Sequence, residues 1–406
     1  MTKLHRRLRG AYNIDDLREL ARRRLPKGLF EFVDRGAEDE LTLARNRAAF
    51  DRQDLLPRVL IDVSARSQKT TLFGTEQASP MVVGPTGATS LLWYDGELAL
   101  ARAAAKAGIP YTLSISSITP MEKIAEQGGG QQWFQLYMWP DRKMSFEIVD
   151  RVKRLGFKVL IVTVDNVAAP NREYNQRNQM SVPMQFSARN IWHAAYHPHW
   201  ATTVIARYLL TTGIPSFSNL PKELQSNLRG KGIVFPRNGS LTWDDVRAIR
   251  NRWPGPLLVK GIMHPADAMS AINSGADGVV VSNHGGRSLD SAPATLDVLP
   301  RIVDAIGGKS MVLLDGGIRR GTDVAKALAL GARAVLMGRA PLWGVAAAGE
   351  PGAYHALAIL QTEIDRVMAL TGCTAVTQFR EGNEDPRDPS RAPVAANGFT
   401  QDDNFR

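Results

Sequence analysis

From position 81 onward, short apolar runs alternate along the chain with longer amphipathic stretches. The short runs are rich in Val, Leu and Ile, which favours buried strands, whereas the stretches between them carry apolar residues at helical spacing. Eight strands that alternate with helices predict an α/β fold of the (β/α)8 TIM barrel type. We expect the strands at Met81–Pro85, Pro110–Ser114, Trp133–Tyr137, Val159–Val164, Leu257–Val259, Gly278–Val281, Met311–Leu314 and Ala334–Met337, and helices between them, for example at Gly96–Ala107, Met144–Leu155, Pro265–Ser274 and Thr322–Leu330.

Two segments depart from this alternation. Residues 1–56 are expected to be an N-terminal helical segment, in which Asn13 or Asp15 caps a first helix and Leu25-Pro26 marks the start of a second. The stretch from Asp165 to Leu257 is too long for one crossover, which predicts a long insertion after the fourth strand, over residues 184–240. We expect one barrel domain over residues 12–376 and a disordered tail, rich in Pro, Asp, Asn and Arg, over residues 377–406.

The insertion mixes aromatic and basic side chains. Aromatic rings with a polar edge suit the headgroup region of a membrane, and arginines suit anionic lipid. A peripheral membrane-docking segment is therefore one interpretation, and a lid over the pocket or a subunit contact are the alternatives. The residues concerned are Trp192, Tyr196, Trp200, Tyr208, Arg189 and Arg207.

Composition narrows the class of protein. The single cysteine, Cys373, excludes an intrachain disulfide and suits a reducing compartment. No apolar run of about 18 residues is present, so we expect no membrane-spanning helix, and no apolar run follows the basic N-terminus as in a signal peptide. The formal charge of +10 can draw the chain toward anionic lipid or substrates, or it can simply reflect the arginine content. We expect no nucleic-acid partner, since no binding motif accompanies the charge.

Polar and glycine residues gather where the predicted strands end. The carboxyl ends of barrel strands converge on one pocket, so these residues are expected to lie together. His284 can move a proton near neutral pH, and Arg287 can bind a carboxylate through two hydrogen bonds. After the seventh and eighth strands, Gly316, Gly317, Gly338 and Arg339 suit a phosphate site.

Two other kinds of site are not supported. His193, His197 and His199 lie close together in the insertion, but no carboxylate partner or strand-end position supports metal binding, and we expect no metal. No Gly-x-Gly-x-x-Gly run opens a helix after a strand, so a nicotinamide site is not indicated.

Five motifs carry a resemblance to a known family. They are Gly36–Asp39, Phe134–Tyr137, Val259–Gly261, Ser282–Arg287 and Asp315–Gly321. Over roughly residues 12 to 375 the chain resembles the FMN-dependent 2-hydroxy acid dehydrogenases and oxidases, closest in pattern to the membrane-associated mandelate and lactate dehydrogenases. The resemblance implies an FMN cofactor and the oxidation of an (S)-2-hydroxy acid to a 2-oxo acid. It also implies a homo-oligomer, expected to be a tetramer, that is cytoplasmic and peripheral on the inner face of the cell membrane.

The resemblance also implies roles for individual residues. His284 would be the catalytic base, oriented by Asp165, and Tyr137 would hydrogen-bond the substrate oxygen. Arg172 and Arg287 would bind the substrate carboxylate. Lys260 would face N1 and O2 of the flavin, where a fixed positive charge stabilises the reduced ring. The remaining cofactor contacts would be Pro85, Thr86, Gly87, Ser114, Gln135, Thr163 and Ser282, with Asp315, Gly316, Gly317, Arg319, Gly338 and Arg339 at the ribityl chain and phosphate.

One residue departs from the family pattern, and two bear on substrate size. Phe32 stands where the family usually has a tyrosine that helps to bind the carboxylate, so binding must depend on the two arginines. Ser116 and Ala169 are small where glycolate oxidases carry bulky groups, which favours a mandelate-like acid first and lactate second.

Several functional alternatives remain open at this stage. Electrons can pass to a quinone or another respiratory acceptor, or, in a soluble oxidase, to oxygen to give hydrogen peroxide. His284 can take the Cα proton, or the hydroxyl proton while hydride leaves. A nucleotide dehydrogenase would need a loop cysteine, but Cys373 lies beyond the last strand. A catalytically inactive scaffold would have lost catalytic residues, and they are all present.

Overall fold

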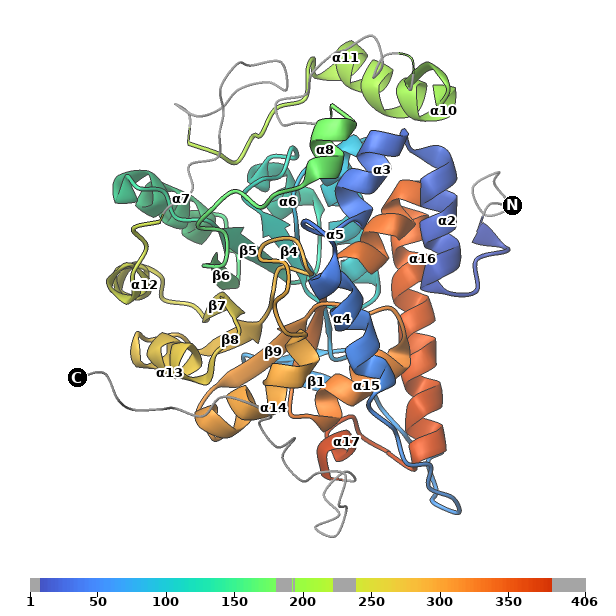
Figure 1. Cartoon of the computed structure of the whole chain (residues 1–406), viewed down its shortest axis with the longest axis vertical. Coiled ribbons are helices and arrows are strands. Elements are labelled where there is room, and N and C mark those ends of the chain that lie inside the picture. The colour runs from blue at the N-terminus through green and yellow to red at the C-terminus, as the bar shows by residue number, and fades with distance from the viewer. Residues whose placement is uncertain (1–7, 180–191, 193, 222–238, 382–406) are drawn as a thin grey trace, which may run out of the picture.

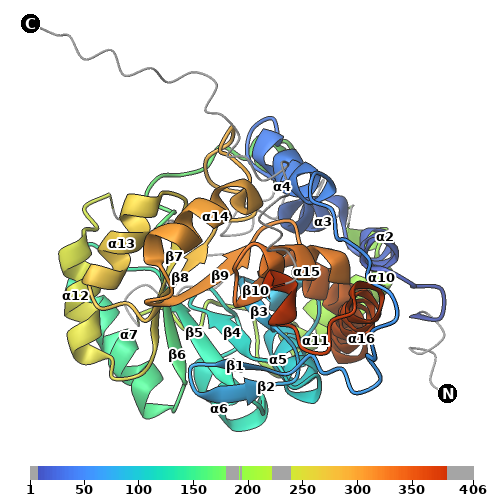
Figure 2. The same cartoon turned by 90° about the horizontal axis from the view of Figure 1, so that it is seen from below.

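The eight strands close into one parallel barrel. A computed structural model describes residues 8–179, 192, 194–221 and 239–381. The barrel has the strand order β10-β3-β4-β5-β6-β7-β8-β9, with helices around it, and confirms the predicted (β/α)8 fold (Figures 1 and 2). The strands are β3 (Met81–Thr86), β4 (Tyr111–Ser114), β5 (Gln132–Leu136), β6 (Val159–Thr163), β7 (Leu257–Ile262), β8 (Gly278–Val281), β9 (Met311–Asp315) and β10 (Ala334–Met337).

The predicted bounds of β8 and β10 are correct at both ends, and the largest difference is in β7. This strand was expected to end at Val259, but it continues to Ile262, so Lys260 lies within the strand and not after it. Val259 pairs with Val162, Lys260 with Thr163, and the register shifts only after Lys260. The sequence pattern ended the strand too early because it treated the charged residue Lys260 as the start of a loop.

Side-chain alternation divides each strand between two cores. Val82, Trp133 and Leu258 belong to a small cluster that fills the barrel, whereas their neighbours belong to the large core under the helices. Because side chains alternate along a strand, every second residue continues to face inward toward the carboxyl end. There the inward series becomes polar. It includes Thr86, Ser114, Gln135, Tyr137, Thr163, Asp165, Lys260, Ser282, His284 and Asp315.

The barrel helices lie where the amphipathic stretches were predicted, within two residues at each end. The long α16 is broken at Ala348 and Gly349, whose backbone is not helical. The first residues of the predicted tail form the short helix α17, and the rest of it lies outside the described residues. The helices are α5 (Gly96–Lys106), α6 (Met121–Gln127), α7 (Arg142–Arg154), α12 (Trp243–Arg252), α13 (Pro265–Asn273), α14 (Thr295–Ile306), α15 (Gly321–Ala329), α16 (Arg339–Thr371) and α17 (Gln378–Glu381).

The N-terminal segment forms α2 (Ile14–Arg24), α3 (Lys27–Asp34) and α4 (Leu41–Asp51). Of the two predicted caps, Asn13 is the one that caps α2, through a reciprocal capping box with Asp16, and α3 begins directly after Pro26. The sequence pattern did not predict the hairpin of β1 (Thr70–Leu72) and β2 (Thr75–Gln77). Leu72 joins the cluster inside the barrel, and Phe73 packs edge-on against Trp133 with ring centroids 6.0 Å apart. The hairpin therefore closes the amino end of the barrel.

The described part of the insertion contains a helical segment made of α10 (Pro198–Trp200), η2 (Ala201–Ala206) and α11 (Arg207–Thr211). It lies beyond α3 and the short helix α8 (Glu173–Arg177), at the end of the molecule farthest from α17 (Figure 1). Trp200, Val204 and Tyr208 are spaced one turn apart and form its buried face. The Trp200 indole donates to the carbonyl of Leu91 at 2.8 Å.

This arrangement corrects the expectation that all four aromatic residues of the insertion face a membrane. Trp200 and Tyr208 are buried against the barrel, whereas Trp192 and Tyr196 are exposed and lie edge to face, 5.4 Å apart. Arg207 stacks over the ring of Tyr94, while Arg189 and His193 lie outside the described residues. In the part of the chain that the structure describes, no helix is long and apolar enough to cross a membrane.

Candidate active site

A cavity of about 550 Å³ opens at the carboxyl end of the barrel. This volume is typical of a site for a small molecule or cofactor. All the predicted site residues line it except Asp165 and Ser282, which stand directly behind His284 and Lys260. The predicted residues in its wall are Pro85, Thr86, Gly87, Ser114, Gln135, Tyr137, Thr163, Arg172, Lys260, His284, Arg287, Asp315, Gly316, Gly317, Arg319, Gly338 and Arg339.

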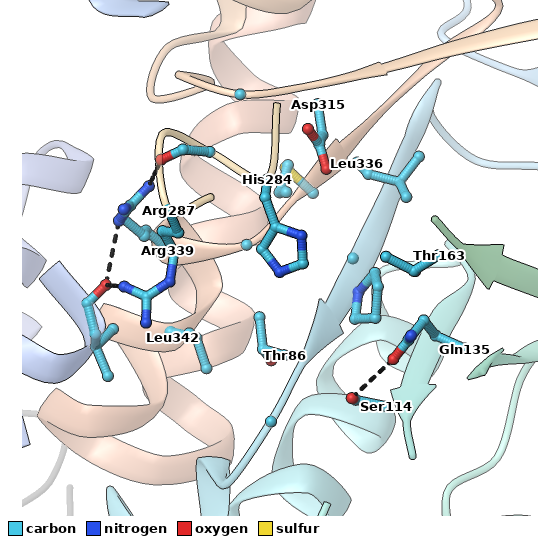
Figure 3. A pocket seen from close by; sticks show the side chains of 18 of the residues that line it. Thr86, Ser114, Gln135, Thr163, His284, Arg287, Asp315, Leu336, Arg339 and Leu342 are labelled. Carbon is cyan, nitrogen blue, oxygen red and sulfur yellow. Dashed lines mark hydrogen bonds between the residues drawn. The ribbon is translucent and has the colours of Figure 1, made fainter. Parts of the chain in front are cut away.

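His284 lies at the centre of the cavity, and Asp165 orients its ring. The ring projects into the cavity (Figure 3). The Nδ1 atom lies 2.8 Å from Oδ1 of Asp165, and Nε2 lies 3.4 Å from the hydroxyl of Tyr137. Burial alone would raise the pKa of Asp165, but attraction to His284 and Lys260 outweighs it and leaves the pKa below its usual value. Burial raises the pKa of Tyr137 to about 12. The site thus holds an ionised carboxylate behind the imidazole and a neutral phenol in front of it.

The backbone near His284 is fixed by close contacts. His284 itself has a left-handed φ of 57°, and its N–H donates to Oγ of Ser282 at 3.1 Å. Gly261 has a φ of 109°, and a Cβ there would come within 2.6 Å of the Cβ of Asp165. Only glycine therefore lets β7 pass beside the carboxylate that holds the imidazole.

Lys260 is a buried cation with two partners. Its Nζ donates to Oγ of Ser282 at 2.8 Å and lies 2.9 Å from Oδ2 of Asp315. Burial acts to lower the pKa of Lys260, but Asp315 and Asp165 more than compensate, and the pKa lies above its usual value. Lys260 therefore carries a fixed positive charge at the base of the cavity.

Two arginines close one side of the cavity. Arg287 donates to the carbonyl of Arg35 at 2.8 Å, and its guanidinium lies 5.6 Å from the ring centroid of Phe32. Arg172 in turn donates to the carbonyl of Arg287 at 2.9 Å. Phe32 thus contacts an arginine through its ring face at the position where a tyrosine would offer a hydroxyl.

Glycines and cations form the other side. Gly316 and Gly317 have φ values of 100° and 87°, a backbone conformation in which successive N–H groups can converge on an anion. Arg319 lines the cavity and lies 5.0 Å from the centroid of Trp343. Burial and then repulsion from Arg287 lower the pKa of Arg339 to about 9. Arg319 pairs with Asp15 only at 3.5 Å, and Arg339 donates to backbone carbonyls, so a bound anion such as a phosphate would neutralise charge at this end.

Polar atoms in the cavity wall fit the flavin ring of FMN. Nε2 of Gln135, Oγ1 of Thr163 and Oδ1 of Asp315 are buried and have no hydrogen-bond partner in the described structure. Buried polar atoms in proteins are normally paired, so a ligand with donors and acceptors along one edge is expected there. Gln135 also accepts from Ser114 at 2.9 Å, which fixes its amide (Figure 3).

The structure adds residues that the sequence did not place in the site. From α4, Asn46 exchanges hydrogen bonds with Asn283, and Arg47 donates to the carbonyl of Gly317, so this helix supports both loops. Asn166, Asn175 and Phe217 line the cavity. No pattern singled them out, because Asn166 and Phe217 lie on irregular segments after β6 and Asn175 lies on the short helix α8, which is too brief for a periodic signal.

Only one of the two small residues predicted to bear on substrate size lies in the cavity wall. Ser116 lines the cavity as predicted, but Ala169 is exposed and is not part of its wall, because the chain turns outward after Asn166. Ala169 is therefore not the residue that leaves room for a large substrate. Cys373 is buried just beyond α16, away from the cavity, as the argument against a cysteine nucleophile required.

A TIM barrel with a buried lysine, a His–Asp pair and a cavity end lined by glycines and arginines fits a flavin-dependent oxidoreductase. Residues 21–384 match the FMN-dependent dehydrogenase family. The chain is 40% identical to (S)-mandelate dehydrogenase of Pseudomonas putida over 91% of its own length and 92% of that protein. It is 41% identical to L-lactate oxidase of Nostoc sp., over 89% of this chain and 94% of that one.

A solved structure described as the monotopic membrane protein (S)-mandelate dehydrogenase superposes with a TM-score of 0.86 at 39% identity, covering 91% of this chain and 98% of the other. The chain therefore belongs to the FMN-dependent dehydrogenases. Its cofactor is FMN, and it is an enzyme that oxidises a 2-hydroxy acid.

Proposed function

We propose that the enzyme oxidises an aromatic, mandelate-like (S)-2-hydroxy acid to its 2-oxo acid and passes the electrons to a membrane quinone or another respiratory acceptor. The observation that carries the proposal is the His284 imidazole. It is held at 2.8 Å by a buried carboxylate and faces a cavity that also contains Tyr137, Arg172 and Arg287. The cavity thus contains a base, a hydrogen-bonding group and two arginines that can bind a carboxylate. The oxidation of a bound 2-hydroxy acid uses all of these groups.

In the proposed mechanism, Arg287 and Arg172 bind the substrate carboxylate, and the Tyr137 hydroxyl hydrogen-bonds the substrate oxygen. Nε2 of His284 takes a proton from the substrate, while Asp165 holds the other ring nitrogen and stabilises the charge that the ring gains. FMN, when bound, supplies the two-electron acceptor. Lys260 would hold a fixed positive charge beside the bound cofactor, which would favour its reduced, negatively charged form.

The test of this mechanism is His284→Gln. Glutamine can keep a hydrogen bond but cannot take the proton, so flavin reduction should slow by about 10⁴-fold, the upper range for loss of a general base. FMN content, measured from the visible spectrum, should stay the same because His284 is not among the cofactor ligands. Reduction by mandelate at a near-normal rate in stopped-flow experiments without oxygen would remove His284 from the mechanism.

The preference for an aromatic acid rests on the cavity wall. Phe32 and Phe217 contribute apolar aromatic side chains to the wall, and Ser116 is small. Relatives of similar identity include both mandelate and lactate enzymes, so the comparison does not choose between them. Steady-state kcat/KM for mandelate should exceed that for lactate, and a clear preference for lactate or glycolate would overturn this part of the proposal.

Membrane docking is supported by a patch of exposed apolar residues on the insertion, here called the docking patch. Its members are Trp192, Tyr196, Leu209 and Leu210, of which Leu210 is 86% exposed. Apolar groups of this kind favour contact with lipid. The (S)-mandelate dehydrogenase whose structure superposes with a TM-score of 0.86 is described as a monotopic membrane protein. We propose that the patch docks the enzyme on the inner face of the cell membrane.

The docking patch can be tested without disturbing the barrel. Leu209→Gln combined with Leu210→Gln should reduce co-sedimentation with anionic vesicles, since neither side chain packs against the barrel. Leu370→Gln is the matched control, because Leu370 is also exposed but lies at the far end of α16. Equal vesicle binding by the double variant and the wild type would contradict docking by this patch.

The alternative is an oxidase that passes electrons to oxygen, and the similarity to an L-lactate oxidase favours it. Reoxidation of the reduced enzyme distinguishes the two. A quinone analogue should reoxidise the flavin much faster than air-saturated buffer, whereas fast production of hydrogen peroxide would support the oxidase.

We further propose a homotetramer, to which exposed Leu56, Val59 and Leu60 can contribute an apolar contact, and light scattering would measure its mass.

A further inference from the structure

We propose that the side chain of the preferred substrate carries a hydroxyl group and that Asn175 recognises it. The inference rests on the proposed oxidation of a 2-hydroxy acid in this cavity and narrows its substrate class. It assigns Asn175 as a specificity-determining residue for a hydroxylated aromatic acid.

Asn175 is positioned beside the carboxylate-binding group. It lies on α8, which begins directly after Arg172, and its backbone N–H donates to the carbonyl of Arg172 at 2.9 Å. Residues three apart on a helical turn share a face, and both Arg172 and Asn175 line the cavity. Asn175 therefore lies on the same part of the cavity wall as the arginine that would hold the substrate carboxylate.

The Asn175 amide has an unmet hydrogen-bonding need. Its Oδ1 is buried and has no partner in the described structure. The similar atoms of Gln135 and Thr163 lie on barrel strands, where a bound flavin would account for them. Asn175 lies instead on α8, outside the barrel strands and on the substrate side of the cavity. A buried acceptor at this place points to a donor on the substrate.

The other residues of the cavity wall indicate which part of the substrate bears the hydrogen-bond donor. Phe32 and Phe217 are apolar and suit a ring, while the polar Asn166 lies near Asn175 in sequence and also lines the cavity. An aromatic ring with one hydroxyl can contact the apolar residues through the ring and the polar residues through the hydroxyl. A hydroxyl donates to an amide oxygen and accepts from an amide nitrogen, so it pairs with either end of the asparagine side chain.

The size of the effect follows from what an unpaired group costs. A site built to hydrogen-bond a hydroxyl discriminates against the analogue that lacks it, because its own polar group is then left buried and unpaired. We expect kcat/KM for 3- or 4-hydroxymandelate to exceed that for mandelate by about 10-fold or more. Both ring positions are tested because they probe different parts of the wall: a 4-hydroxyl lies on the axis of the bond between the ring and the hydroxy acid carbon, whereas a 3-hydroxyl lies to one side of it.

The experiment compares the three acids as reductants of the FMN-loaded enzyme without oxygen. Asn175→Leu keeps the size of the side chain and removes its hydrogen bonds, so the ratio of hydroxymandelate to mandelate should fall by about 10-fold, toward one. Asn175→Ala should lower the ratio in the same way. Gln176→Leu is the control, because Gln176 is the exposed neighbour on α8 and should leave the ratio unchanged.

The outcomes separate the two proposals. If mandelate reduces the flavin but the wild type shows no preference for either hydroxylated acid, the inference about Asn175 is wrong and the proposed oxidation stands. A preference that survives both Asn175 variants also overturns it. If no 2-hydroxy acid reduces the flavin, the proposed function fails and the inference fails with it. A purely structural role for Asn175 would change all three acids alike and leave the ratio untouched.

Discussion

Replacing Asp165 by asparagine tests the contact on which the proposed base depends. Asp165 is buried, its Oδ1 lies 2.8 Å from Nδ1 of His284, and its pKa is lowered, so it is ionised throughout the neutral range. Asparagine has nearly the same shape but no charge. The variant therefore removes the charge that stabilises a protonated imidazole and leaves the cavity intact.

The magnitude follows from the kind of hydrogen bond lost. A hydrogen bond to a charged group contributes about 1.5–3 kcal/mol, and 1.36 kcal/mol corresponds to a factor of ten. Flavin reduction in Asp165→Asn should therefore slow by about 10- to 150-fold. This loss is smaller than that expected for His284→Gln, because the imidazole is still present and can still take the proton.

Stopped-flow reduction by substrate without oxygen measures the effect directly. Asp267→Asn is the matched control, since it removes the same charge from the exposed surface of α13 and should leave the rate unchanged. FMN content and thermal midpoint should match the wild type in both variants. A rate for Asp165→Asn within twofold of the wild type would refute the role of this carboxylate, and a rate lower than that of His284→Gln would show that the carboxylate does more than support the imidazole.

Three further predictions follow from the same geometry. Gly261→Ala should reproduce much of the Asp165→Asn defect, because the new Cβ would lie 2.6 Å from the Cβ of Asp165, and a normal reduction rate would contradict this. Lys260→Met should make the flavin harder to reduce, because it removes the charge that favours the reduced ring; a midpoint potential measured by dye equilibration that does not become more negative would argue against this role. Between pH 8 and 10 the rate of flavin reduction should not decline through deprotonation of Lys260 or Tyr137. The pKa of Lys260 is raised above its usual value of 10.5 and that of Tyr137 is raised to about 12, so both groups remain protonated. A rate that falls in this pH range in the wild type, but not in Lys260→Met or Tyr137→Phe, would contradict this prediction.

The sequence determined the barrel and most of its mouth because both depend on local pattern. Apolar runs of Val, Leu and Ile cannot stay in water, and their regular alternation with amphipathic helices leaves few folds besides a parallel barrel. The period of two along each strand then carries the inward series from Val280 through Ser282 to His284. Residues at strand ends could therefore be grouped before any contact was known.

Only the tertiary structure decided how the irregular segments complete the site. The helical pattern of α4 gives no sign that Asn46 pairs with Asn283, some 237 positions away along the chain. Nothing local distinguishes Trp200, which packs against the barrel, from Trp192, which is exposed, because the difference lies in which helix face meets Leu91. Asn175 and Ala169 are both near Arg172 in sequence, yet only Asn175 reaches the cavity. Local pattern determines which elements form, whereas side-chain partners depend on how distant segments pack, and that packing is where the specificity of this site is set.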